Sequence, residues 1–281
     1  MMSNDDRRSD RPRRGGVDRE PTGWQPSVGA AREPIGRDQA SRRKGTPPRR
    51  TRDVAGPPRP DLPADEEPQL PRGIVKEIER AIGNPSRSRD IALALSIGSA
   101  AIDEERPDVA VEVLAWAKAE APRISAIREA YGVALYHLDD YAAALTELQA
   151  YRRLTGRTDQ NHVIADCFRG LGRAVDQVAE VAEALVRDDT APIDRRTEAA
   201  IVWAAAVADQ GDPAGGRAVL RRFIDRNDIG EGEHALRLRY LAADLAERVG
   251  DTDDARQGFA SIAAIDPDRF DVAHRLGALD N

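Results

Sequence analysis

The stretch Ala130–Leu154, AYGVALYHLDDYAAALTELQAYRRL, contains two runs of apolar residues separated by the two aspartates of HLDDY. Apolar residues at three- and four-residue intervals on both sides of this break indicate two amphipathic helices. Acidic side chains at such a break cap helix N-termini and close turns. The stretch therefore predicts a helical hairpin, and the fold depends on whether that hairpin recurs.

Similar pairs of helical segments follow one another from residue 71 to residue 281. We expect hairpins at about residues 88–121, 122–155, 158–190, 194–228 and 232–266, after a short lead helix in RGIVKEIERAIG and before a last helix at 268–279. Alternating apolar and polar residues, the mark of a strand, are missing from the sequence. An all-α chain is predicted.

Equivalent residues of neighbouring hairpins recur at a fixed interval of 34 residues, as Gly98 and Gly132 do. A helix–turn–helix period of this length, with a small residue in the first helix and Ala-x₃-large in the second, resembles the tetratricopeptide repeat. The matching residues are Gly98, Ala110, Leu114 and Pro122; Gly132, Ala144, Leu148 and Gly156; and Ala243, Ala255, Phe259 and Pro267. The likeness covers roughly residues 88–279 and is weaker in the middle, where Gln177 replaces a small residue and the period lengthens to 39.

The resemblance implies a right-handed solenoid of about five repeats, in which glycine and alanine are needed where helices cross closely. The last helix would cap the stack with Val272, Leu276 and Leu279 facing inward. The first helices would line a concave groove that holds an extended peptide or a partner helix. The candidate lining residues are Glu129, Val133, Tyr136, His137, Asp159, His162, Asp166, Arg169, Arg237, Tyr240 and Asp244. The cation and amide set with which some family members grip a C-terminal carboxylate is missing, because Leu95 and Ser99 stand at those positions.

Residues 1–70 have a different composition, rich in Arg, Pro, Gly and Asp and poor in large apolar residues. Such a segment buries too little apolar surface to offset the entropy of ordering it, so a disordered tail is predicted for 1–70 and a folded array for 71–281. Fifteen Lys and Arg face twelve Asp and Glu in the tail, whereas the array has an excess of ten acids. The tail's basic block consists of Arg42, Arg43, Lys44, Arg49, Arg50, Arg52 and Arg59.

Candidate catalytic, cofactor and metal residues are not indicated. The acid pairs, such as Asp139–Asp140, fall at turns where carboxylates suit a helix N-terminus. The four histidines lack metal-ligand spacing, and RGLGRA lacks the third glycine and the strand of a nucleotide-binding motif. Trp116, Trp203 and Cys167 fit apolar helix faces. One cysteine and no N-terminal apolar segment suit a cytoplasmic protein, and the excess of Arg over Lys resembles a GC-rich bacterial coding bias.

Two functions are compatible with these patterns. The first is a non-enzymatic scaffold whose groove binds a protein, as solenoids present extended surfaces. The second is a nucleic-acid- or ribosome-associated factor in which the basic tail contacts phosphates. A further hypothesis is that the tail folds back onto Asp159, Asp166 and Asp244 in the groove, because tethering raises its effective concentration.

Overall fold

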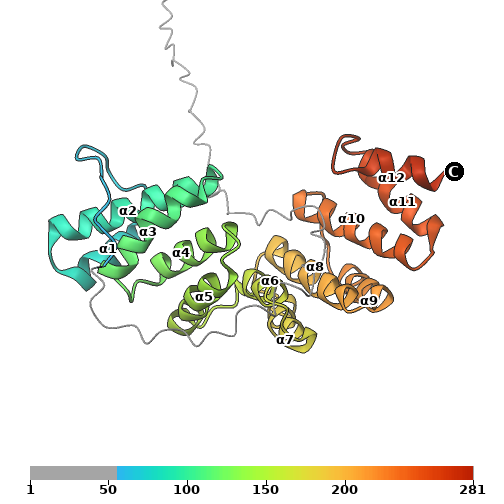
Figure 1. The fold of residues 1–281 in the computed structure, drawn as a ribbon, viewed down its shortest axis with the longest axis horizontal. Helices are drawn as coiled ribbons and strands as arrows, with labels where there is room; N and C mark the ends of the chain where they lie inside the picture. The colour runs from blue at the N-terminus through green and yellow to red at the C-terminus, as the bar shows by residue number, and fades with distance from the viewer. Residues whose placement is uncertain (1–55, 281) are drawn as a thin grey trace, which may run out of the picture.

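The computed structural model describes residues 56–280, which contain twelve α-helices and no strand. The helices are α1 (Arg72–Ile82), α2 (Pro85–Asp103), α3 (Pro107–Glu120), α4 (Ser125–His137), α5 (Tyr141–Thr155), α6 (Asn161–Gly170), α7 (Val175–Val186), α8 (Ile193–Asp209), α9 (Pro213–Ile224), α10 (Glu233–Arg248), α11 (Thr252–Ala263) and α12 (Val272–Leu279). From α2 to α11 they form five hairpins in series (Figure 1). The predicted all-α array is confirmed.

All five hairpins close with the same turn. A residue with positive φ follows the first helix, and the amide of the next residue donates to a carbonyl five residues before it, which is the Schellman way of ending a helix. The bonds are Arg106 to Ala101, Asp140 to Leu135, Arg173 to Phe168, Asp212 to Val207 and Asp251 to Ala246. Glycine occupies the positive-φ position in three turns, and Glu105 and Asp139 occupy it in the other two.

The two aspartates of HLDDY therefore have separate backbone roles. Asp139 adopts a φ of 60°, which ends α4, and its carboxylate accepts a hydrogen bond from the Tyr141 hydroxyl at 2.9 Å. Asp140 accepts the amide of Ala143 at 3.1 Å and so caps α5. Asp212 and Asp251 cap α9 and α11 in the same way. The prediction that these acids are turn residues is confirmed.

Small residues lie where the two helices of a hairpin cross. A Cβ atom added to Gly98 would lie 2.5 Å from Cγ of Leu114, which real Cβ atoms do not tolerate. In the hairpin α10–α11 the glycine is on the second helix, and a Cβ on Gly258 would lie 2.8 Å from Cβ of Ala243. The close crossing predicted from the repeat spacing is thus present at both ends of the array.

Each second helix packs against the first helix of the following hairpin. The buried apolar residues form four clusters in succession along the stack. The last hairpin is covered by α12, which contacts α11. Val272 of α12 is fully buried in a cluster with Phe259 and Ile262, while Leu276 and Leu279 are partly buried against it. The predicted inward face of the last helix therefore matches the structure.

The segment 56–70 differs from the prediction of a tail that extends to residue 70. Pro60 and Leu62 are buried, and Leu62 belongs to the apolar cluster of the first hairpins. The guanidinium of Arg89 donates to the carbonyls of Ala64 and Glu66 at 2.6 Å each, and the amide of Gln69 donates to Oγ of Ser96 at 2.9 Å. The composition of this segment predicts disorder. It does not reveal that a side chain of α2 hydrogen-bonds the backbone carbonyls of the segment.

Candidate partner-binding surface

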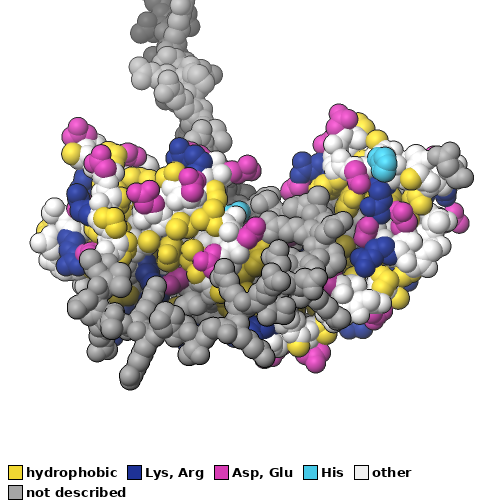
Figure 2. Space-filling view, viewed as in Figure 1, with side chains coloured by type: hydrophobic (Ala, Val, Ile, Leu, Met, Phe, Trp, Pro, Cys, Tyr) yellow, Lys and Arg dark blue, Asp and Glu magenta, His cyan; other side chains and the backbone are white. Residues whose placement is uncertain are grey.

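The first helices of the hairpins form the inner side of a curved array. Figure 1 shows α4, α6, α8 and α10 on the inner side of the curve and α5, α7 and α9 on its outer side. In Figure 2 hydrophobic side chains gather over α2 to α4, whereas charged side chains of both signs are mixed over α10 to α12. Contacts between successive first helices therefore lie along this inner side.

A line of polar contacts crosses α4, α6 and α8. The hydroxyl of Tyr136 donates to Oδ2 of Asp166 at 2.5 Å, and Nη1 of Arg169 lies 3.1 Å from Oδ1 of the same carboxylate. Nε of Arg169 donates to Oδ2 of Asp209 at 3.1 Å. Burial, followed by the negative charge of Asp166, raises the pKa of Tyr136 well above its ordinary value, so the phenol keeps its proton. Four side chains from three hairpins are thereby joined.

A buried ion pair joins α8 to α10. Nη2 of Arg237 lies 3.1 Å from Oε2 of Glu198, and both side chains are less than a tenth exposed. Burial raises the pKa of Glu198 to about 7 even though the guanidinium opposes that shift. Burial also lowers the pKa of Arg237. Each charge compensates the other, and neither is presented to a ligand.

A third polar group joins α10 to the last helix. Nη2 of Arg275 lies 2.8 Å from Asp244 and 2.7 Å from Glu247. The hydroxyl of Tyr240 donates to Asp271 at 2.6 Å, and its ring centroid lies 4.8 Å from that of Phe270. These contacts leave Tyr240 and Asp244 half-buried at the C-terminal end of the inner side.

Four of the predicted groove residues are buried and require a correction. Val133, Asp159, His162 and Arg237 are between 2% and 8% exposed, so their side chains pack between helices and do not line an open groove. Asp159 precedes α6 and accepts the hydroxyl of Tyr151 at 3.0 Å. An isolated hairpin would expose these side chains, but neighbouring hairpins cover them in the array.

The other predicted groove residues are half-buried: Glu129, Tyr136, His137, Asp166, Arg169, Tyr240 and Asp244. Glu129 accepts a hydrogen bond from Nε2 of Gln160 at 2.6 Å, and burial raises its pKa. The ring of His137 meets that of Tyr136 edge to face with centroids 5.9 Å apart, and burial lowers the pKa of the imidazole. The structure thus brings Tyr136, His137, Asp166 and Arg169 together and leaves Tyr240 and Asp244 at a separate place.

Several residues of this surface were not predicted from the sequence, namely Gln160, Glu198, Asp209, Glu247, Asp271 and Arg275. A signal for three of them exists in the spacing. The contacts Arg169–Asp209 and Glu198–Arg237 join residues 40 and 39 positions apart. The contacts Tyr136–Asp166, Glu129–Gln160, Tyr240–Asp271 and Asp244–Arg275 join residues 30 or 31 positions apart. This is one repeat less about one helical turn. A search for oppositely charged or hydrogen-bonding residues at that separation would have found Gln160, Asp271 and Arg275 but not Glu198, Asp209 or Glu247.

The predicted basic block has one residue in the described part of the chain. Arg59 lies 2.9 Å from Asp90 of α2, so it is held on the first hairpin. Arg42, Arg43, Lys44, Arg49, Arg50 and Arg52 lie outside the described residues. The three acids to which the tail was expected to fold back have cations of the array beside them: Arg157 at Asp159, Arg169 at Asp166 and Arg275 at Asp244.

Among residues 56–280, no cluster of His, Cys, Asp and Glu has the arrangement of a metal site. Helices of sufficient length and apolarity to cross a membrane are also missing from that range. Cys167 is fully buried, and burial raises the pKa of its thiol, which leaves it a small core residue.

Comparison with known proteins identifies the repeat. The family model of the tetratricopeptide repeat matches residues 95–157 and 202–270. The fold is similar to the crystal structure of TTC0263, described as a thermophilic TPR protein of Thermus thermophilus, with a TM-score of 0.52 and 17% identity over 66% of this chain and 96% of that one. It is also similar to pilF of Pseudomonas aeruginosa, with a TM-score of 0.50 and 16% identity over 73% of this chain and 96% of the other. A search of curated proteins found no match.

Proposed function

We propose that this chain, of which residues 95–157 and 202–270 match the tetratricopeptide repeat, is a non-enzymatic scaffold. It would bind an extended peptide or a helix of a protein partner along the inner side of α4, α6, α8 and α10. The observation that carries this proposal is the line Tyr136–Asp166–Arg169–Asp209, in which polar side chains of three hairpins are joined and remain partly exposed. A ligand lying along the inner side would meet these groups in a fixed order.

The contacts also define what kind of ligand fits. Asp166 and Arg169 provide an acceptor and a donor within one turn of α6, held in place by their own hydrogen bonds. Side chains held in this way lose little entropy on binding, which favours recognition of a peptide's polar groups. Tyr240 and Asp244 lie on α10 and would meet a different part of the same ligand.

The test uses photo-crosslinking from the full chain. A photoreactive amino acid is placed at Arg169 of α6, a helix on the inner side of the curve, or at the exposed Arg152 near the end of α5, a helix on the outer side (Figure 1). Crosslinks to one partner are expected from position 169 and not from position 152. The partner is then purified, and its affinity is measured for Arg169→Ala, Asp244→Ala and the control Arg152→Ala.

We expect losses of about tenfold for the first two variants and less than about twofold for the control, since residues at the centre of an interface dominate its energy. Thermal melting of each variant separates loss of binding from loss of folding. Equal crosslinking from both positions, or equal affinity in all three variants, would refute the inner-side proposal. Binding of the partner that depends only on residues 1–55 would show that the tail is the recognition element.

A further inference from the structure

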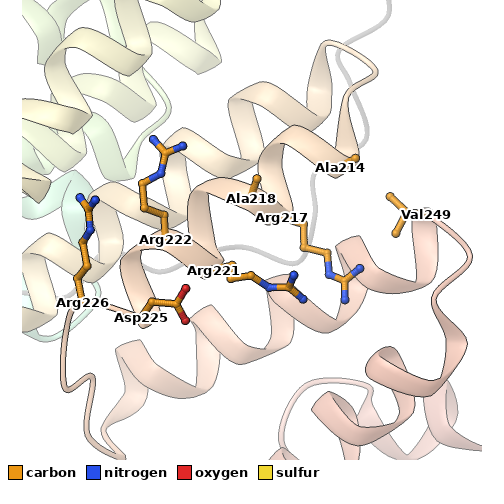
Figure 3. Close-up of a pocket in the computed structure, with 8 residues that line it drawn as sticks. All are labelled: Ala214, Arg217, Ala218, Arg221, Arg222, Asp225, Arg226 and Val249. Carbon is orange, nitrogen blue, oxygen red and sulfur yellow. The ribbon is translucent and has the colours of Figure 1, made fainter.

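A second surface lies on the outer side of the array, over α9. A cavity of about 450 Å³ is lined by Ala214, Arg217, Ala218, Arg221, Arg222, Asp225, Arg226 and Val249. Figure 3 shows its four arginines distributed along α9 and the turn that follows it, from near Ala214 to Arg226. All the lining residues except Val249 come from this single helix and its C-terminal turn. The cavity is therefore separate from the contacts that join the first helices.

The lining carries four guanidinium groups and one carboxylate. Arg217 is engaged in the fold, because its Nη2 lies 2.8 Å from Asp251 and also pairs with Asp254. Arg221, Arg222 and Arg226 are exposed, and none of the three forms an ion pair with another side chain in residues 56–280. Three exposed guanidinium groups without an ion pair thus line one cavity together with a single carboxylate, Asp225, on a chain whose net charge is −7.

Folding alone accounts for only part of this arrangement. Arg221 and Arg222 lie in the last turn of α9, where cations complement the helix dipole. However, Arg217 and Arg221 are four residues apart on α9, and like charges at that spacing oppose each other on a helix. Two cations are enough to complement the dipole of α9. A cavity lined by four guanidinium groups is suited to bind an anion.

We propose that this cavity binds an acidic segment of a protein partner, with at least two Asp or Glu side chains contacting Arg221, Arg222 and Arg226. Guanidinium groups bind carboxylates through paired hydrogen bonds, and these are stronger than bonds between neutral groups. Ala214, Ala218 and Val249 of the same lining would contact the methylene groups of such side chains. The proposal does not depend on whether the inner side of the array binds a ligand.

The size and surroundings of the cavity favour a peptide over a nucleic acid. The basic surface is confined to one helix and its turn, and a volume of about 450 Å³ holds a few side chains. The array around it carries an excess of acids, which would repel the continuing phosphates of a long polyanion. A short acidic segment avoids that repulsion because its charge ends where the basic surface ends.

The experiment measures binding of a fluorescent hexaglutamate peptide to the full chain at low ionic strength. The test variant is Arg221→Gln with Arg222→Gln and Arg226→Gln. The matched control is Arg152→Gln with Arg153→Gln and Arg173→Gln, which removes three exposed arginines from elsewhere in the array. Residues 1–55 are identical in both proteins, so any binding by the basic tail contributes equally.

We expect the test variant to bind about tenfold more weakly than the wild type and the control to remain within about twofold, with the wild-type affinity falling as salt is added. An undetectable wild-type affinity, or equal losses in the two variants, would overturn the proposal. If a hexauridylate RNA binds more tightly than hexaglutamate and this binding is lost in the same variant, the ligand of the cavity is a nucleic acid and not an acidic peptide. If the triple variant loses its helical circular dichroism, the single changes Arg222→Gln and Arg226→Gln apply the same criterion.

Discussion

A Cβ atom added to Gly132 would lie 2.7 Å from Cγ of Leu148 and 3.2 Å from its backbone nitrogen. The backbone of α4 therefore approaches Leu148 of α5 so closely that a Cβ atom at position 132 would force this side chain and the α5 backbone to shift. We expect Gly132→Ala to lower the free energy of unfolding by about 1–3 kcal/mol and Gly132→Leu by more, because overpacking forces the helices apart. Chemical denaturation followed by circular dichroism measures both changes.

Gly73 serves as the control for that substitution. It is also in a helix, α1, but nothing lies within 4 Å of the Cβ position. Gly73→Ala is expected to leave stability unchanged or to raise it by up to about 1 kcal/mol through helix propensity. Similar effects of alanine at positions 73 and 132 would contradict the role assigned to the close crossing.

The cap formed by α12 can be tested at Val272, which is fully buried. We expect Val272→Ala to cost about 1–3 kcal/mol, because two methyl groups are removed from the apolar cluster around Phe259. His274→Ala, an exposed position on the same helix, should change stability by less than about 0.5 kcal/mol. Removal of residues 269–281 should expose the cluster to a hydrophobic dye. Unchanged melting after that removal would show that α12 is not a cap.

The ion pair between Glu198 and Arg237 predicts a dependence on pH. Burial raises the pKa of Glu198 from its ordinary value of 4.5 to about 7, so the folded state favours the protonated acid. Its contribution to stability is complete below pH 4.5 and is lost as the pH rises through about 7, by up to about 3 kcal/mol. Glu198→Gln should remove that loss. Denaturant titrations at about pH 5 and pH 7.5 compare the two proteins, and parallel pH profiles would contradict the assignment.

His162 predicts a dependence of the opposite sign. Burial, and then the positive charge of Arg195, lowers the pKa of this imidazole from 6.5 to about 3, so the folded state holds it neutral. The contribution to stability is present above pH 6.5 and is lost as the pH falls toward 3. The expected loss is about 2 kcal/mol on going from pH 6.5 to about pH 5. In His162→Gln the free energy of unfolding should fall less steeply over this interval, and an equally steep fall would refute the interpretation.

The segment 56–70 predicts a difference between two truncations. Removing residues 1–55 should leave the free energy of unfolding of the remaining chain unchanged. Removing residues 1–70 should lower it by about 1–3 kcal/mol, because burial of Leu62 and the bonds of Arg89 to two carbonyls are lost. Arg89→Ala should reproduce part of that loss. Equal free energies of unfolding for the two truncated proteins would show that the folded array begins after residue 70.

Much of the fold could be predicted from local patterns. The close crossings at Gly98 and Gly132 and the turn at Asp139 and Asp140 each form within a single hairpin. The spacing of these residues along the chain is therefore enough to assign their roles. The segment 56–70 could not be placed in this way, because its order depends on Ser96 and Arg89, which belong to a helix that comes later in the sequence. Composition reports how much apolar surface a segment has, but it does not report which side chains of other elements hold its backbone.

The residues predicted to line the groove are likewise assigned partly by local spacing and partly by tertiary packing. Arg169 and Asp166 were assigned to the inner side from helical spacing alone, and they are half-buried there. His162 and Arg237 satisfy the same spacing but are buried, because neighbouring hairpins approach closely enough to cover them.

Helices, turns and the repeat follow from residues within about forty positions of one another, since the interactions that form a hairpin are local. Which polar side chains pair with each other, which stay accessible and where uncompensated arginines gather depend on how hairpins pack across the stack. Those contacts join distant residues through small differences in burial and charge, and only the three-dimensional arrangement decides them.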